Sequence, residues 1–436
     1  MTMQWWGILL VFFGGFIALI LTGFPIAFAF FLINIAGAYL FMGGTRGIEQ
    51  LVLNIYSSLA NFTLTPIPLF ILMGEIIFRC GIAYNVLNIF DKFFGRIPGR
   101  LGMLAVAAST FFSGLTGSAI SNTALLASSL MPEMRKRGYG KPLMIGPIVG
   151  TGGLAMMIPP SALAVVLGSV AHISISGILI GGILPGLIMA FLYSSYIITR
   201  TLINPSIAPA YEVQRSDFPG LAKEFLIYVM PLFSVIALVL GPIYMGIATP
   251  TEAASLGCIG ALILAISYRK LTLAILVDTL ASSLKTTGMI FLVVAGSAGY
   301  SQIISFTGAG AGLIGSIISL NLPDVLLVML MLSVLLLLGC FMDQIAMMMV
   351  TVPLFMPIIY QANISPLWFG IMMLIALDIG FTSPPFGLLL FVMKGIVSED
   401  ITMMDIYKAA LPFILCNLLT LALILAFPRI VMVFMK

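Results

Sequence analysis

One stretch, Pro98 to Pro160, restricts the fold of this chain more than any other. Two apolar arms flank a small, polar run at residues 113–122. Each arm is about 15 residues long, whereas a helix needs about 20 residues to span the hydrocarbon of a bilayer. The stretch is therefore predicted to begin with a re-entrant hairpin over residues 98–132 and to continue as a broken helix over residues 142–171.

The polar tip of this hairpin is expected to lie at a functional site. Irregular backbone and polar side chains at membrane depth are tolerated only where they are buried in protein or line a wet cavity. A broken helix beside the tip, interrupted here at Pro159-Pro160, is how transporters hold ions and anions near the midplane. The alternative is that the small residues serve only close helix packing.

The same pattern occurs twice. Five prolines recur after 225 residues, far more than chance predicts, and Gly114 recurs as Gly339. The proline pairs are Pro25 and Pro250, Pro98 and Pro323, Pro132 and Pro357, Pro159 and Pro384, and Pro160 and Pro385. Both halves are therefore predicted to contain a hairpin and a helix broken at a Pro-Pro pair.

The composition places the chain in a lipid bilayer. Hydrophobic residues make up 61% and charged residues 8% of its 436 positions, which excludes an ordinary soluble domain. The net charge of +4 comes from basic residues spread over short loops, so no nucleic-acid partner is expected. The four cysteines lack metal-ligand spacing and are expected to be packing residues. No cleavage site accompanies residues 4–21, which are predicted to be a retained helix.

The segments in order predict an all-α polytopic membrane protein with two repeats. The first repeat covers residues 1–200, a cytoplasmic linker 201–224 and the second repeat 225–436. The second repeat is predicted to contain a hairpin over 323–357 and a broken helix over 367–392. The other predicted spans are residues 4–21, 25–41, 66–78, 178–198, 225–246, 250–268, 286–302 and 411–433, and the predicted surface helices are 44–63, 81–97 and 303–321.

Charge predicts that the two repeats have opposite orientations. Basic residues flank both sides of the first hairpin, whereas residues 316–323 and 358–366 contain no Lys or Arg. By the positive-inside rule the first hairpin enters from the cytoplasm and the second from the other side. Following the spans outward places both termini outside the cytoplasm.

Five ionisable residues in apolar surroundings could carry chemistry. Asp343, at the tip of the second hairpin, is the best candidate, although it could also be a neutral acid or make a structural hydrogen bond. Asp378 could equally cap a half-helix or bind a ligand. For both Glu75 and Glu252, interfacial pairing and a functional role are equally favoured. His172 is interpreted as a residue at a helix boundary rather than as a proton relay. The sequence has no catalytic triad, zinc spacing or nucleotide-binding loop, so an enzyme is not expected.

These motifs resemble the large membrane subunit of bacterial tripartite ATP-independent periplasmic (TRAP) transporters, and more distantly the divalent-anion/sodium symporters. The resemblance covers essentially the whole chain. Its most specific parts are Ser113 to Ser121, Pro132 to Tyr139, Ile158 to Ser161, Ser174 to Ser176 with Pro185-Gly186, and Gly339 to Asp343 with Pro353 and Pro357. Ser121-Asn122-Thr123 is similar to the hairpin tip of the symporters, where it helps to bind sodium and the substrate carboxylate.

Two positions depart from the family pattern. The usual Asp-x-x-Pro of the second hairpin is Asp343-Gln344-Ile345-Ala346 here, and the usual Thr-Pro-Pro is Ser383-Pro384-Pro385 after Thr382. These changes affect the expected shape of the local backbone, so the family's substrate contacts are not carried over directly to these positions. The class of protein is unaffected.

The resemblance implies an elevator-type, sodium-driven importer of organic acids in the bacterial inner membrane. Hairpins and broken helices would form the moving transport unit, and the remaining spans and surface helices the scaffold. A small four-helix membrane subunit and a periplasmic substrate-binding protein would be its partners. The substrate stays open among a C4-dicarboxylate, a 2-oxo acid, a sugar acid such as sialic acid, and a sulfonate. A stand-alone anion symporter of the same fold is the alternative, and a channel or an intramembrane enzyme is a more distant one.

Sodium is the expected coupling ion, and no other metal or cofactor is predicted. A site at membrane depth would take its oxygens from hydroxyls, amides and unpaired carbonyls. The predicted sodium ligands are Ser118, Ser121, Asn122, Gly150 and Gly152 in the first half and Gly339, Asp343, Gly380, Thr382 and Ser383 in the second. The predicted substrate-binding residues are Ser113, Thr116, Asn122, Ser161 and Ser383. Asp343 would give the second site an anionic ligand that the first site lacks.

Overall fold

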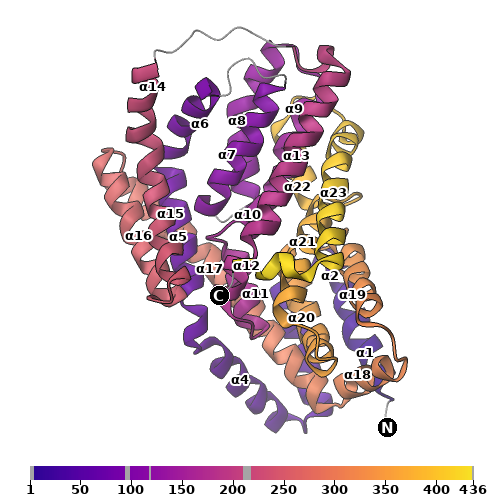
Figure 1. The fold of residues 1–436 in the computed structure, drawn as a ribbon. Helices are drawn as coiled ribbons and strands as arrows, with labels where there is room; N and C mark the ends of the chain where they lie inside the picture. Colours follow the sequence, from indigo (N-terminus) through magenta and orange to yellow (C-terminus); the bar gives the residue numbers. More distant parts are fainter. Residues whose placement is uncertain (1–3, 94–98, 117–118, 210–217, 435–436) are drawn as a thin grey trace.

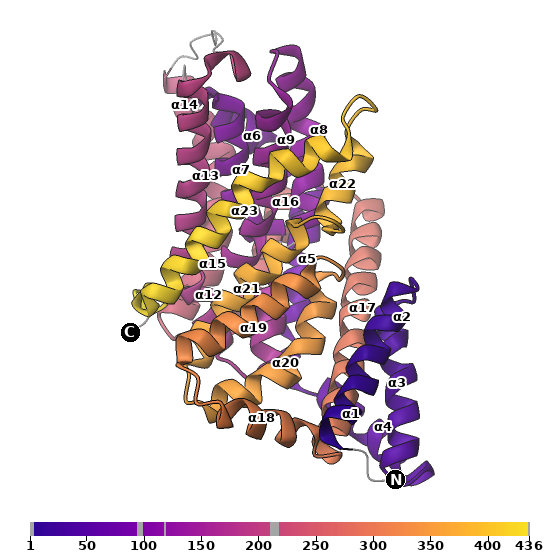
Figure 2. The ribbon, with the colours of Figure 1, turned by 90° about the vertical axis from the view of Figure 1, so that its right-hand side faces the viewer.

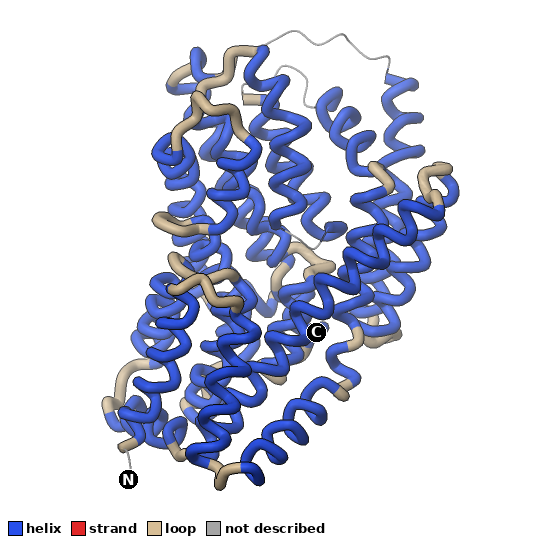
Figure 3. Tube along the Cα trace, turned by 180° about the vertical axis from the view of Figure 1, so that it is seen from behind, coloured by secondary structure: helices blue, strands red, loops and turns tan. Residues whose placement is uncertain are grey.

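The structure, a computed structural model, describes residues 4–93, 99–116, 119–209 and 218–434. Every regular element in these residues is helical (Figure 3). Seven of the helices described are long and apolar enough to cross a membrane, or eight if the pair bent by 45° at Pro159-Pro160 counts as one span. The predicted all-α polytopic membrane fold is confirmed.

The first half of the chain contains the helices that surround the first hairpin. They are α1 (Trp5–Leu9) and α2 (Gly15–Leu21), joined by a π-helical turn, α3 (Ile26–Phe41), α4 (Thr45–Leu59), α5 (Pro66–Arg79), α6 (Ile82–Phe93), α7 (Arg100–Thr116), α8 (Ala119–Lys136), α9 (Lys141–Gly150), α10 (Leu154–Met157), α11 (Ala162–Val170), α12 (Ile175–Gly181) and α13 (Ile183–Ile203). The predicted first hairpin is the pair α7 and α8.

The second half of the chain contains the helices that surround the second hairpin. It contains α14 (Phe218–Glu224), α15 (Met230–Tyr244), α16 (Pro250–Ser267), α17 (Leu273–Phe306), α18 (Ala309–Ser319), α19 (Asp324–Gly339), α20 (Gln344–Gln361), α21 (Pro366–Thr382), α22 (Leu388–Ile396) and α23 (Met403–Ala426). A shift of 225 residues carries both ends of α8 onto both ends of α20, and the start of α9 onto the start of α21. The inverted orientation of the two repeats stays a prediction.

Two groups of helices lie side by side (Figure 1). In one group α5 and α15 pack against α16, and α3 packs along α17. In the other group α8 packs against α22, α9 against α23, and α19 against α21. Figure 2 shows that the open ends of the two hairpins, α7 with α8 and α19 with α20, lie toward opposite ends of the molecule. Both hairpin tips therefore point toward its middle.

The predicted boundaries were wrong around the long helix α17. The sequence predicted a crossing over 286–302 and a surface helix over 303–321, but a single helix runs from Leu273 to Phe306. Asp278 and Lys285 interrupt the apolar pattern and hid its first three turns. Gly308, with a φ of +71°, separates α17 from α18, which covers only Ala309–Ser319.

Two other boundaries also differ from the prediction. The last span was predicted over 411–433, whereas α23 begins at Met403 and ends at Ala426. Its start is fixed by a capping box, in which the Thr402 hydroxyl accepts from the backbone of Asp405 and the Asp405 carboxylate accepts from that of Thr402. Both ends of the predicted linker are helical, and residues 210–217 lie outside the described part of the chain.

Ion pairs connect the two halves at one end of the molecule. Arg135, at the end of α8, pairs with Asp400 at 3.0 Å, and Lys141 pairs with Asp405 at 2.8 Å. Asp400 lies in the connection between α22 and α23, and Asp405 lies in the first turn of α23. Ser398 also donates to Asp400 at 2.5 Å, and this bond, followed by the Arg135 guanidinium, holds the pKa of Asp400 below its usual range.

Candidate transport site

The tip of the first hairpin is tied to the break in the next helix. Asn122, in the first turn of α8, is fully buried, and its Nδ2 donates to Ser109 Oγ at 2.5 Å. Ser109 Oγ donates in turn to the Thr151 carbonyl oxygen at 2.8 Å. Asn122 Oδ1 is buried and has no hydrogen-bond partner among the described residues. Both arms of the hairpin therefore meet at a short 3₁₀ turn, Thr151–Gly153.

Glycines form this turn because neighbouring groups lie directly against its backbone. A β-carbon on Gly152 would lie 2.9 Å from Thr123 Oγ1, and one on Gly153 would overlap the carboxyl group of Asp378. A β-carbon on Gly150 would overlap an aromatic ring of α23. The break predicted at these glycines is confirmed, and close packing gives Gly150 and Gly152 a steric role in addition to the predicted one.

The other predicted residues of the first half are separated. Ser118 and the side chains of Ser113 and Thr116 lie outside the described part of the chain. Ser121 lies next to Asn122 in the first turn of α8. Ser161 is almost fully buried and caps α11, because its Oγ accepts from the Ala164 backbone at 3.3 Å. The substrate-binding role of these residues stays a prediction.

Asp343 begins the second arm of the second hairpin. It is the N-cap of α20, and its Oδ1 accepts hydrogen bonds from the backbone N–H groups of Ile345 at 2.9 Å and Ala346 at 3.0 Å. An aspartate at this position is a favourable cap because it satisfies free N–H groups and the helix dipole. Asp343 therefore makes structural hydrogen bonds, which was one of its predicted alternatives. The predicted ion-binding role would use the same carboxylate and stays a prediction.

The tip of the second hairpin touches the end of α21. Gly339 and Gly380 meet backbone to backbone, and a β-carbon on Gly380 would lie 2.6 Å from the Gly339 Cα. Thr382 Oγ1 donates to the carbonyl oxygen of Asp378 at 2.9 Å. Ser383 follows as the C-cap, so four of the five sodium ligands predicted in the second half lie around one hairpin–helix junction.

The structure contradicts one of the two roles predicted for Asp378, the capping of a half-helix. Asp378 lies inside α21, four residues before the helix ends, so it does not cap a half-helix. The side chain is fully buried, and Asn417 Nδ2 in α23 donates to its Oδ2 at 2.8 Å. The hydroxyl of Tyr193 in α13 donates to the Oδ1 of Asn417. Three helices therefore contribute to one buried polar row.

The two remaining acids have structural partners. Glu75 pairs with Arg79 at 2.7 Å along α5. Glu252 forms a capping box with Thr249 at the start of α16, where its carboxylate accepts from the Thr249 backbone at 2.8 Å. The structure therefore agrees with the interfacial alternative for Glu75 and gives Glu252 a capping role.

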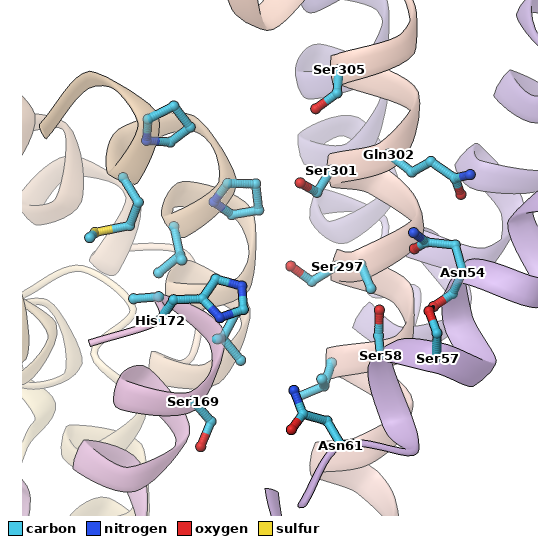
Figure 4. A pocket seen from close by; sticks show the side chains of 18 of the residues that line it. Asn54, Ser57, Ser58, Asn61, Ser169, His172, Ser297, Ser301, Gln302 and Ser305 are labelled. Carbon is cyan, nitrogen blue, oxygen red and sulfur yellow. The ribbon is translucent and has the colours of Figure 1, made fainter. Parts of the chain in front are cut away.

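A pocket of about 890 Å³ with many polar lining residues lies between α4 and α17 on one side and α11 and α20 on the other (Figure 4). One wall comes from α4 and α17, where Ser297, Ser301 and Ser305 follow one another at intervals of one turn. Ser169 and His172 face these serines from the end of α11. The other polar lining residues are Asn54, Ser57, Ser58, Asn61, Thr63, Gln302 and Tyr360. Among the predicted substrate-binding residues whose side chains the structure describes, Asn122, Ser161 and Ser383, none lines this pocket.

Several residues of these sites were missed by the sequence analysis. Ser109 and Thr151 are ordinary small polar residues whose partners lie 13 and 42 residues away along the chain. Asn417 offered a signal, because an amide inside an apolar span needs a partner. No part of the sequence pattern connected it with Asp378 or Tyr193.

The fold and its junctions define the class of protein. Two hairpins with polar residues near their tips, each against an interrupted helix in an apolar bundle, are the architecture of a polytopic secondary transporter. The family model for the "Tripartite ATP-independent periplasmic transporter, DctM component" matches residues 13–430. The chain therefore belongs to this family of large permease subunits, which confirms both the predicted resemblance and the prediction that it is not an enzyme.

Individual relatives agree with this assignment. The chain is 29% identical to the sialic acid TRAP transporter large permease protein SiaM of Vibrio cholerae, covering 95% of both chains. It is 28% identical to the C4-dicarboxylate TRAP transporter large permease protein DctM of Rhodobacter capsulatus, covering 97% of both. The crystal structure of the Alcanivorax borkumensis YdaH transporter has a similar fold, with a TM-score of 0.63, 15% identity, and coverage of 88% of this chain and 89% of that one.

Proposed function

We propose that this chain is the sodium-coupled permease of a TRAP transporter that imports an organic acid by an elevator movement. The first hairpin carries the proposal. Asn122 Oδ1 is buried and has no hydrogen-bond partner in the part of the chain that the structure describes, and an unpaired buried polar atom costs roughly 1–3 kcal/mol. A cation bound at the hairpin tip would use this oxygen. The Ser109 and Thr151 bonds hold the amide in place for it.

The position of the pocket supports the elevator movement. Its serine wall belongs to α17, part of the proposed scaffold, while the facing wall belongs to α11 and α20 of the proposed transport unit. Hydroxyl and amide groups along this boundary would hydrate or bind a polar solute between the moving surfaces. The volume is also in the range of small-molecule sites.

In the proposed transporter, partner proteins deliver the substrate to this chain. A small four-helix membrane subunit and a periplasmic binding protein would complete the tripartite transporter, in a bacterial inner membrane with both termini periplasmic. The two relatives above are named for different acids, sialic acid and a C4-dicarboxylate, and this chain is almost equally identical in sequence to both. Sequence identity alone therefore favours neither substrate. The binding protein is expected to determine much of the selectivity, since the described pocket lining contains no Lys or Arg.

Reconstituted uptake tests the proposal. Proteoliposomes with the small subunit and a substrate-loaded binding protein should take up substrate only with an inward sodium gradient at a fixed membrane potential. Asp343→Ala should abolish or strongly weaken this uptake, and Ser121→Ala should raise the sodium concentration needed for half-maximal uptake. Uptake that responds to a proton gradient and not to sodium would refute the sodium assignment.

The alternative is a stand-alone sodium- or proton-coupled anion symporter of the same fold. Omitting the binding protein distinguishes the two. Under the proposal the permease alone imports little, whereas a symporter would import the free acid at an undiminished rate.

A further inference from the structure

A buried acid without a counter-charge lies at the centre of the molecule. Asp378 is fully buried, its Oδ2 has one neutral donor in Asn417, and its Oδ1 has no hydrogen-bond partner among the described residues. Within the same residues, no Lys, Arg or His forms an ion pair with it. A buried charge with no partner is strongly unfavourable, so Asp378 can be ionised only with a positive charge nearby.

The contacts of Asp378 show where that charge would be. Its carboxyl group lies against the backbone of Gly153, at the end of the 3₁₀ turn. Other residues of the same turn contact the first hairpin: Thr123 lies against Gly152, and Asn122 reaches Thr151 through a serine. The turn is therefore in contact with both the first hairpin and a carboxylate of the second half.

The contact between Gly153 and Asp378 joins two positions that the sequence repeat relates to each other. A shift of 225 residues carries Gly153 onto Asp378, so the two touching residues occupy equivalent positions in the two halves. One half has a glycine there and the other half has an acid. The first half thus lacks an acid of its own at this position and receives one from the second half.

We propose that Asp378 supplies the negative charge for a monovalent cation bound at the tip of the first hairpin. This inference rests on the proposed sodium coupling. The groups available in the first half, the Asn122 amide, the Thr151 carbonyl and nearby hydroxyls, are all neutral. Asp378 acts across the turn as a positioning charge, and Asn417 and Tyr193 hold its carboxylate against Gly153. The first cation site is then electrically complete only when α21 of the second half is docked against the turn.

Asp378→Asn tests the proposal because it removes the charge with almost no change in shape. The sodium concentration for half-maximal uptake should rise at least about tenfold, equivalent to about 1.4 kcal/mol of lost binding free energy. Asp324→Asn, the same change at an exposed acid at the start of α19, should leave it unchanged. Tyr193→Phe, which keeps the acid but removes the last bond of the polar row, should raise it by a smaller factor.

A binding measurement covers the case in which Asp378→Asn cannot transport at any sodium concentration. Purified protein in detergent should be stabilised against heating by sodium chloride more than by choline chloride, and Asp378→Asn should lose most of this sodium-specific shift. Sodium-driven uptake with a wild-type sodium dependence in Asp378→Asn would overturn the inference, as would an unchanged sodium-specific shift. Wild-type uptake that ignores sodium would instead refute the proposed function itself.

Discussion

Adding one methyl group at Gly380 should separate the second hairpin tip from α21. The β-carbon of Gly380→Ala would lie 2.6 Å from the Cα of Gly339, whereas two carbon atoms in favourable contact are about 3.5–4.0 Å apart. Because the obstructing atoms are backbone, no change of side-chain rotamer can relieve the overlap. The two helix segments must move apart by roughly 1 Å.

The magnitude follows from two opposing effects. Overpacking of this kind costs typically about 1–3 kcal/mol, and a contact between two backbones lies at the upper end. Alanine in place of glycine in a helix regains about 1 kcal/mol. A net destabilisation of about 2 kcal/mol is therefore expected for Gly380→Ala. Gly288→Ala is the matched control, because Gly288 lies in α17 with no neighbour within 4 Å of the added carbon.

Thermal unfolding in detergent and uptake in proteoliposomes provide the two measurements. The apparent melting temperature of Gly380→Ala should fall, that of Gly288→Ala should stay or rise, and uptake should fall only for Gly380→Ala. Because Thr382 lies at this junction and Asp343 begins the next arm of the same hairpin, uptake should be affected more strongly than stability. Equal melting temperatures and equal uptake for the two variants would show that the two glycines are not in close contact.

Two further predictions concern the ends of the molecule. The pair of Arg135 and Asp400 should stabilise the protein fully above the ordinary aspartate pKa of about 3.9 and lose its effect as pH falls through the lowered pKa of Asp400. Asp400→Asn should therefore lower the apparent melting temperature by the same amount at every pH from 5 to 8. A decrease that varies with pH over this range would contradict the prediction. In a cysteine-free background, single cysteines at the exposed Lys136 and Asn363 should react with a membrane-impermeant thiol reagent from opposite sides, cytoplasmic for Lys136, and labelling from one side would refute the inverted repeats.

The sequence predicted the elements that depend on local pattern. Short apolar arms around a polar tip identified the first hairpin, and the proline offset identified the second. The bounds of α8 and α20 follow this offset. The start of α17 escaped because Asp278 and Lys285 look like a break in a linear pattern. In three dimensions Thr279 and Ser283 face inward on the same helix.

The site could be predicted only at the level of segments. Asn122 was identified because an amide at a hairpin tip is unusual in an apolar chain. Its connection through Ser109 to Thr151 depends on how two arms and a following helix pack, and spacing along the chain does not encode that. Asp378 was assigned a possible capping role from its distance to Pro384-Pro385, whereas packing directs it toward α23 and Gly153.

The length of α17 has a consequence for how the protein lies in a bilayer. Its 34 residues extend about 51 Å at 1.5 Å per residue, while the hydrocarbon core is about 30 Å thick. Even at the steepest usual tilt of about 40°, roughly 26 residues fill that thickness. At least one end must therefore project beyond the hydrocarbon by about two turns. The charged residue Asp278 marks the first two turns as that end, and the side chains of Leu273 and Val277 are exposed there, so this end presents apolar side chains at the membrane surface.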